Sequence, residues 1–194
     1  MTSSKKQKTR ESLLEAAWKR LERGDLAKLE DVAADVGVSR QSVYLHFGSR
    51  GGMLLALVEY IDQQTGLQER IRAVQQTDDP IELLKRTLGL MATYQSEIHG
   101  VAMALVHLAE HDEDVRAALE DRMQRRRQGL AAIVKRLAAA GFLRKGWSQK
   151  EIVDVLWEAG APSSYQHLVV ERGWKPGRYR DWLIWIAMSF VNER

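Results

Sequence analysis

The sequence predicts an all-α protein of about nine helices, with a small N-terminal domain followed by a larger helical one. Apolar residues recur at three- and four-residue spacing along most of the 194 residues, which is the period of an amphipathic helix. Sustained two-residue alternation is missing from the sequence, and no hairpin turn dipeptide separates β-branched runs. With 45% apolar residues, the chain has the composition of one that builds a packed core.

Four helical patterns occupy the first third of the chain. Glycine suits the left-handed conformation that follows a helix, so Gly37 is the expected end of the second pattern. Ser39 and Ser49 can each cap the helix that follows by accepting from backbone N–H groups. The predicted helices cover residues 8–23, 29–36, 39–47 and 49–61.

The remaining predicted helices are marked by their N-terminal residues. Asp79-Pro80 places an acidic cap before a proline that suits the first turn. Acids at residues 112–114 are favourable against the dipole of a long helix, and Ser148 with Glu151 fits a capping box. Gly100 is expected to divide two helices. The predicted segments are a helix that starts at residues 78–80 and ends at Gly100, residues 101–109, 112–141, a helix opening at 148, and 180–192.

Composition excludes several classes of protein. The chain has no Cys, which excludes a disulfide scaffold, a thiolate metal site and a cysteine nucleophile. No apolar run approaches the ~18 residues that a membrane span needs. The basic residues before residue 11 are not followed by the apolar segment of a secretory signal. We therefore expect a soluble, cytoplasmic protein without a metal or other cofactor.

The net charge of +3 is concentrated at one end of the sequence. Residues 1–50 hold ten Lys and Arg against seven Asp and Glu, whereas residues 51–194 hold nineteen of each. Basic character confined to one segment indicates a local anionic partner such as a phosphate backbone. A solvated, mildly basic face is the alternative interpretation of charge alone.

The second and third predicted helices have the dimensions of a helix-turn-helix, with a turn at residues 37–39. In the third helix, Val43 and Phe47 lie one turn apart and are expected to face the core. The opposite faces are polar, and the N-terminal end, where recognition helices meet base edges, carries Arg40, Gln41 and Ser42. Arg is well matched to guanine and Gln to adenine, while Tyr44 and His46 can donate to phosphates.

Residues 29–54, LEDVAADVGVSRQSVYLHFGSRGGML, resemble the DNA-binding motif of the TetR family of bacterial transcriptional repressors. Val32-Ala33, Val36 to Ser39, Ser42, Val43, Tyr44, His46 and Phe47 all stand at the family's spacing, with no insertion. The resemblance implies that these helices bind double-stranded DNA. The implied contact set is Lys28, Ser39, Arg40, Gln41, Ser42, Tyr44, His46 and Arg50. Lys5, Lys6, Lys8 and Arg10 could add backbone or minor-groove contacts.

Three positions depart from the family pattern. Gly51 replaces the usual acid, and Gln41 occupies a position that is often Gly or Pro. Lys28 sits where Thr is frequent, so it cannot accept a capping hydrogen bond but can reach a phosphate. These changes bear on affinity and sequence preference rather than on fold.

The resemblance implies a division into a DNA-binding domain at residues 1–50 and a ligand-binding and dimerisation domain at residues 51–194. The last two helices of two subunits would pack as a four-helix bundle. The final helix is apolar nearly all round, with Trp182 and Trp185 among its residues, so it is expected to be buried. It could be buried in a homodimer or inside a monomer. Paired half-sites in DNA favour the dimer.

A small-molecule effector is expected in the second domain, although the sequence does not identify it. Methionines and aromatics mixed with a few polar groups are typical of ligand pockets, but they are also typical of ordinary cores. The candidate ligand-binding residues are Met91, Tyr94, His99, Met103, His107, Trp157 and Glu158, with Gln95, Tyr165 and Gln166 on the same segments. The basic run at residues 125–127 is expected to be a solvated helix face.

Two other functions stay open at this point. His107, Glu110 and His111 match the His-x-x-Glu-His order of a metalloprotease class, in which two histidines on one helical face hold a metal and the glutamate acts as base. A metal-dependent hydrolase is therefore one alternative. The other is a helical DNA-binding protein with no small-molecule effector. Operator sequence, regulated genes and the direction of any ligand effect are not predicted.

Overall fold

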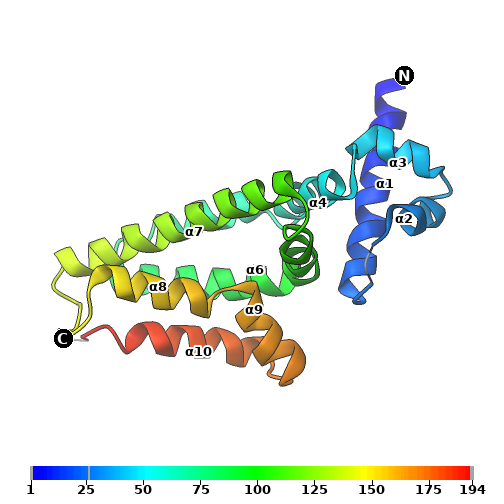
Figure 1. Ribbon diagram of the computed structural model, residues 1–194. Coiled ribbons are helices and arrows are strands. Elements are labelled where there is room, and N and C mark those ends of the chain that lie inside the picture. Colours follow the sequence, from blue (N-terminus) through cyan, green and yellow to red (C-terminus); the bar gives the residue numbers. More distant parts are fainter. Residues whose placement is uncertain (1, 26, 193–194) are drawn as a thin grey trace. The chain divides into compact units, whose positions relative to one another are not determined.

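The computed structural model describes residues 2–25 and 27–192, with side chains from Lys5 onward, and the chain is helical throughout most of this range (Figure 1). No strand occurs in the described residues, where a single antiparallel bridge joins Leu143 and Val191. The helices are α1 (Thr2–Glu22), α2 (Leu29–Val36), α3 (Arg40–Phe47), α4 (Arg50–Gln64), α5 (Leu67–Gln75), α6 (Pro80–Leu108), α7 (Glu113–Ala139), α8 (Gln149–Ala159), α9 (Pro162–Tyr165), the π-helix η1 (Gln166–Glu171) and α10 (Pro176–Met188). The predicted all-α class is confirmed.

Several boundaries differ from those expected. Gly100 does not divide two helices, because α6 continues through it from Pro80 to Leu108. Helices α5, α9 and η1 were not predicted from the sequence. Helices α9 and η1 are too short to show a period, whereas Leu67, Ile71 and Val74 of α5 do stand at helical spacing and were overlooked. The first helix begins at Thr2, so the basic residues from Lys5 to Arg10 belong to α1 and do not form an extended arm.

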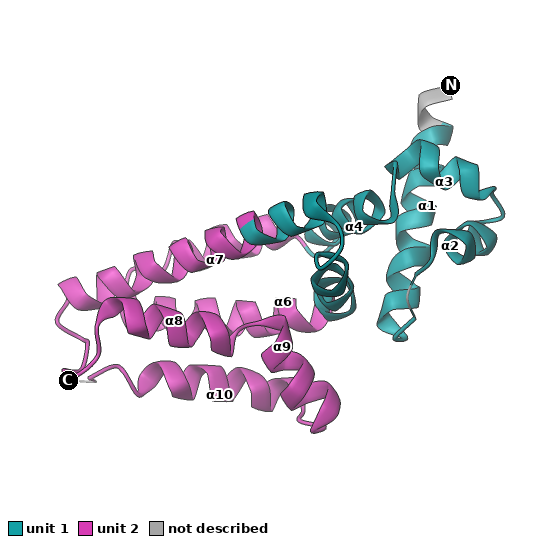
Figure 2. Cartoon of the chain, viewed as in Figure 1, with its two compact units in different colours: residues 1–65, 98–120 teal, residues 66–97, 121–194 magenta. Residues whose placement is uncertain are grey.

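The chain divides into two compact units, coloured separately in Figure 2. Unit 1 contains residues 1–65 and 98–120, and unit 2 contains residues 66–97 and 121–194. Helices α6 and α7 each contribute residues to both. These compact units differ from the predicted functional domains, and the boundary between DNA-binding and ligand-binding domains at residue 50 stays a prediction.

Unit 1 is built on α1, which packs against α2 and α4, while α3 packs against α2 and α4. The interior is aliphatic, and Trp18 meets Tyr60 edge to face at its margin, with ring centroids 6.4 Å apart. Burial of this apolar surface is what holds α2 and α3 against α1 and α4. Residues of unit 1 that are fully or almost fully buried include Leu13, Leu14, Ala17, Val32, Ala33, Val43, Met53, Leu54, Leu57 and Ile61.

Two glycines of unit 1 allow close helix contacts. A Cβ atom on Gly100 would lie 2.6 Å from the backbone oxygen of Leu21, so α6 can approach the end of α1 only because residue 100 has no side chain. A Cβ on Gly51 would lie 2.6 Å from Val115 Cγ2 and 2.8 Å from Asp112 Oδ2. The departure from the family's acid at residue 51 is therefore a packing requirement in this chain.

Unit 2 has its own core, contributed by α6, α7, α8 and α10. Tyr179 is the largest fully buried side chain there, and its hydroxyl donates to the carbonyl of Ala159 at 2.8 Å. The predicted capping box at the start of α8 is confirmed, since Ser148 accepts from the Glu151 N–H and the Glu151 carboxylate accepts from the Ser148 N–H. Within the described residues, no helix has both the length and the hydropathy needed to cross a bilayer.

Candidate nucleic-acid interface

The turn between α2 and α3 has the geometry expected of a helix-turn-helix. Gly37 ends α2 in the left-handed conformation, with φ 72°, and Ser39 caps α3 by accepting from the Ser42 N–H at 3.2 Å. Ser49 caps α4 in the same way, through the Gly52 N–H at 2.9 Å. These three local predictions are confirmed. Lys28 stands at the N-cap of α2 with no side-chain capping bond, and it is exposed.

Exposure divides α3 into an inner and an outer face. Val43 is fully buried, and Phe47 is half-buried one turn later. Ser39 and four side chains of α3, Arg40, Gln41, Tyr44 and Leu45, are exposed, whereas Ser42 and His46 are half-buried. The N-terminal end of α3 therefore presents the residues that a recognition helix uses to meet base edges.

Arg40 is held in place by two neighbours. Its Nη2 atom donates to the Tyr44 hydroxyl at 3.1 Å, and its Nη1 atom lies 2.9 Å from Glu30 Oε1 on α2. The hydrogen bond to Tyr44 and the charge of Glu30 raise the pKa of Arg40. Sequence reasoning placed Arg40 and Tyr44 on one face but missed Glu30, because the pair joins two helices and no spacing rule connects them.

Leu45 is the exposed residue of α3 that sequence reasoning did not assign to DNA. Its side chain is 77% exposed, the largest exposure among the exposed large apolar residues of the described chain. An apolar side chain on a recognition helix can contact the methyl group of thymine in the major groove. Its place one turn after Gln41, on a face away from Val43, was the signal available in the sequence.

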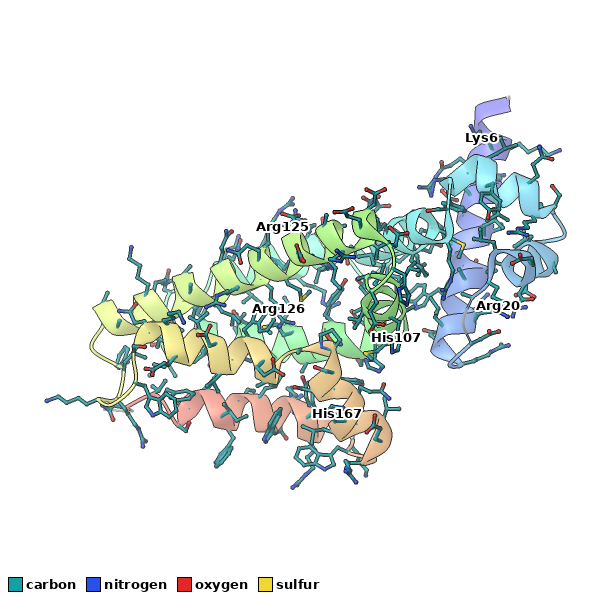
Figure 3. The ribbon with its side chains drawn as sticks, in the orientation of Figure 1. Lys6, Arg20, His107, Arg125, Arg126 and His167 are labelled. Carbon is teal, nitrogen blue, oxygen red and sulfur yellow. The ribbon has the colours of Figure 1, made fainter. Side chains whose placement is uncertain are left out.

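Basic residues of α1 lie beside the C-terminal end of α3. The Arg10 guanidinium carbon lies 4.8 Å from the centre of the Phe47 ring, and Figure 3 shows Lys6 near this end of α3. Burial lowers the pKa of His46, and the charges of Lys6 and Arg10 lower it further. His46 is therefore neutral at pH 7, and the positive charge here comes from α1. If these side chains reach phosphates, they do so from helix α1 and not from an extended N-terminal segment.

An ion-pair network fixes α1 against α2. Arg20 donates to Asp35 through Nε at 2.6 Å and through Nη2 at 2.9 Å, and its Nη1 reaches Asp25 at 2.5 Å (Figure 3). A guanidinium paired in this bidentate way is geometrically specific. The network holds α2 in position, and α2 in turn sets the angle of the turn and of α3. Arg50, the last residue of the expected contact set, opens α4 and is half-buried.

The candidate effector residues are split between the two units. Met91, Tyr94, Trp157 and Glu158 belong to unit 2, whereas His99, Met103 and His107 belong to unit 1. His107 and Glu158 are exposed, and the other five are half-buried. In unit 2 the Tyr94 hydroxyl accepts from Arg122 at 2.5 Å, and the Trp157 indole donates to the carbonyl of Met123 at 3.3 Å. Tyr165 is buried and Gln166 half-buried.

The His-x-x-Glu-His pattern does not form a metal-binding face. Helix α6 ends at Leu108, so His107 lies in its last turn and His111 lies beyond it. The two imidazoles therefore do not share a helical face, which the zinc arrangement requires. The described residues contain no group of three His, Cys, Asp or Glu side chains placed to hold a metal ion.

Two short helices joined by a glycine turn, the second capped by Ser39 and exposed at its N-terminal end, define a helix-turn-helix DNA-binding protein. The sequence profile described as "Bacterial regulatory proteins, tetR family" matches residues 13–57, which contain all of this motif. Residues 13–57 therefore carry the DNA-binding domain of the tetR family of bacterial regulatory proteins.

Three known proteins illustrate the similarity. Nucleoid occlusion factor SlmA of Vibrio vulnificus (strain YJ016) is 28% identical over 152 residues, which is 76% of each chain. A transcriptional regulator from Saccharomonospora viridis, solved in complex with choline, superposes with TM-score 0.80 at 20% identity, over 96% of this chain and 100% of that one. The regulator FadR from Bacillus subtilis, solved with stearoyl-CoA, superposes with TM-score 0.71 at 12% identity, over 93% and 98%. At these identities the two structures establish a shared fold.

Proposed function

We propose that this regulator is a homodimeric repressor that binds a palindromic operator and responds to a small-molecule effector. The observation that carries the proposal is the exposed end of α3, where Arg40 and Gln41 stand free of the core beside the capping Ser39. Two such helices, one from each subunit, would enter successive major grooves about one turn apart. The few placed contacts of each subunit, and not a large positive field, would provide affinity.

An unpartnered apolar face on α10 supports the homodimer. Trp185 is 69% exposed, and Trp182, Ile184 and Met188 are half-buried. A helix that is apolar nearly all round but leaves such side chains exposed in one chain needs a partner surface. This favours burial of α10 in a dimer over burial inside the monomer. Helix α8 packs against α10, so both are available for a four-helix bundle.

The contacts of unit 1 support a route for effector control. Gly51, in the first turn of α4, packs against Asp112 and Val115 at the α6–α7 connection, and both α6 and α7 continue into unit 2. An effector that changes the position of α6 or α7 would move α4 and alter the spacing of the two recognition helices. It can shift that equilibrium only by its differential affinity for the two states.

The experiment measures oligomeric state and DNA binding together. Wild type, Trp185→Glu and the matched exposed variant Gln128→Glu are compared by light scattering and by gel shift on operator DNA. We expect the first variant to be monomeric with weakened operator binding, and the control to behave as wild type. A monomeric wild type that binds a single half-site would refute the dimer. Operator binding unchanged by every compound that stabilises the protein would favour a regulator without an effector.

A further inference from the structure

The three consecutive arginines on α7 do not share one environment. Arg125 pairs with Asp121 on the same helix, and Arg127 pairs with Asp154 on α8. Arg126 points the other way, as Figure 3 shows for Arg125 and Arg126. The prediction that residues 125–127 form a solvated helix face is therefore correct for Arg125 and wrong for Arg126. A helix turns by about 100° per residue, so neighbouring side chains point to different sides.

Arg126 reaches the C-terminal end of α8. Its Nη1 atom donates to the Gly160 carbonyl at 2.8 Å, and its Nη2 atom donates to the Trp157 carbonyl at 2.5 Å. The guanidinium carbon lies 5.3 Å from the centre of the Trp157 ring. The Nε atom is buried and has no hydrogen-bond partner. Arg126 makes no ion pair with any carboxylate in the described part of the chain, and the charge of exposed Glu158 acts on it only from a distance.

This environment is unfavourable for a cation. Burial lowers the pKa of Arg126 to about 10, which reflects the free energy of removing the guanidinium from water. The two carbonyls at the negative end of α8 offset part of that cost. Arg126 is half-buried as a whole, with its Nε enclosed, and a full counter-charge is still missing. An enclosed charge without a partner is destabilising. Such perturbed groups are concentrated at functional sites.

A second buried donor lies on α6 in the same unit. The Gln95 side chain is 7% exposed, and its Nε2 atom has no partner. Gln95 stands one helical turn after Met91, whose terminal methyl lies against Gly160. Because Gly160 also accepts from Arg126, Met91 and Arg126 meet at the same residue. Buried donors without acceptors are rare in native proteins, and two in one unit indicate an acceptor supplied from outside.

We propose that Arg126 binds the anionic group of the effector, a carboxylate or a phosphate carried on an apolar body. The proposal rests on the effector role argued above and names the chemistry of its ligand. A carboxylate or phosphate offers the acceptor that Nε lacks and the charge that compensates the guanidinium. The Gln95 amide is the second donor, and Trp157 and Met91 contact the apolar body. A cation such as choline would be repelled here.

The test uses the full chain and four probes of defined chemistry. Decanoate and decyl phosphate, below their micellar concentrations, are compared with neutral decanamide and with choline by calorimetry and thermal shift. We expect at least one anion to bind and the two controls not to bind. Arg126→Gln should weaken the anion at least tenfold, and Arg125→Gln, its matched exposed neighbour, should leave affinity unchanged. If decanoate alone binds, the group is a carboxylate; if decyl phosphate alone binds, it is a phosphate.

A second variant guards against a folding defect in the first. Gln95→Leu keeps the volume and removes only the amide, so it should weaken the anion several-fold with the helix content unchanged. Decanamide binding as tightly as decanoate, equal affinity in wild type and Arg126→Gln, or no binding of either anion would overturn the proposal. Operator binding measured on the same samples separates this failure from failure of the regulator itself, because only the latter abolishes the gel shift of the unliganded protein.

Discussion

Arg40 stands one turn before Tyr44 on α3, and its guanidinium both donates to the Tyr44 hydroxyl at 3.1 Å and lies 5.3 Å from the centre of the tyrosine ring. Together with Glu30 this contact orders a long, exposed side chain before any DNA is bound. Ordering a side chain in advance lowers the entropy lost on binding. Tyr44 therefore presents Arg40, and we propose that it contacts a phosphate as well.

Removal of the Arg40 guanidinium should affect sequence preference. We expect Arg40→Ala to weaken specific operator binding by ~1–3 kcal/mol and to relax preference at one base pair. Fluorescence anisotropy on the operator and on random DNA measures both quantities. Arg125→Ala, exposed in unit 2, is the control. An equal loss of affinity on operator and random DNA would remove Arg40 from base readout.

Leu45 and Val43 give a matched pair on one helix. Leu45 is 77% exposed, so Leu45→Ala should change the free energy of unfolding by less than about 0.5 kcal/mol while weakening binding to sites with a critical thymine. Val43 is fully buried, so Val43→Ala should cost roughly 1.5–3 kcal/mol of stability. Denaturant unfolding and anisotropy distinguish the two. Stability lost through Leu45→Ala would mean that its side chain is not exposed in solution.

Two glycines of α6 differ in what surrounds them. Gly100→Ala would place Cβ 2.6 Å from the Leu21 carbonyl, a backbone atom that cannot move aside, so we expect the thermal midpoint to fall. A Cβ atom on Gly89 would meet nothing within 4 Å, and Gly89→Ala should stabilise by about 0.4–1 kcal/mol through the unfolded chain. Calorimetric scans of both variants test this. Equal midpoints would show that α6 and α1 leave room for a side chain at residue 100.

His46 gives stability and DNA affinity opposite dependences on pH. Burial and the charges of Lys6 and Arg10 lower its pKa below the ordinary 6.5. The unfolded chain therefore binds more protons between pH 6.5 and the folded-state pKa, and stability falls as pH decreases through that window. A bound phosphate favours the imidazolium, so operator affinity at constant salt should rise over the same window.

His46→Gln is the matched variant for this prediction, because its amide cannot titrate. Chemical denaturation at pH 7.5 and pH 6.0 gives the change of stability with pH, and anisotropy at the same two pH values gives the change of operator affinity with pH. We expect both slopes to be smaller in the variant than in wild type. Slopes that are identical in wild type and His46→Gln would assign the pH dependence to another group.

Local sequence rules predicted the parts of the fold that depend on nearby residues. The caps at Ser39 and Ser49, the glycine end of α2 and the burial of Val43 all follow from short-range patterns, and each is confirmed. The prediction that Gly100 ends a helix was wrong, because this glycine lies within α6 and allows its contact with α1. A close approach between distant segments leaves no local pattern to read.

The candidate sites show the same limit. The exposed end of α3 was predictable from helical geometry, but the Glu30–Arg40 pair joins two helices. The inward direction of Arg126 also depends on where α8 ends. A run of three arginines contains no sign of which one faces the interior until the neighbouring helices are placed.

Selection of binding sites from a random DNA pool tests the central claim most directly. Wild type and Arg40→Ala are each used to enrich sequences at constant salt, and the number of chains per bound duplex is counted by native mass spectrometry. We expect wild type to enrich an inverted repeat with half-sites about one helical turn apart, bound by two chains, or a multiple of two. The Arg40→Ala variant should enrich a repeat with one position relaxed in each half. Enrichment of no shared sequence, or of a single half-site bound by one chain, would contradict the account.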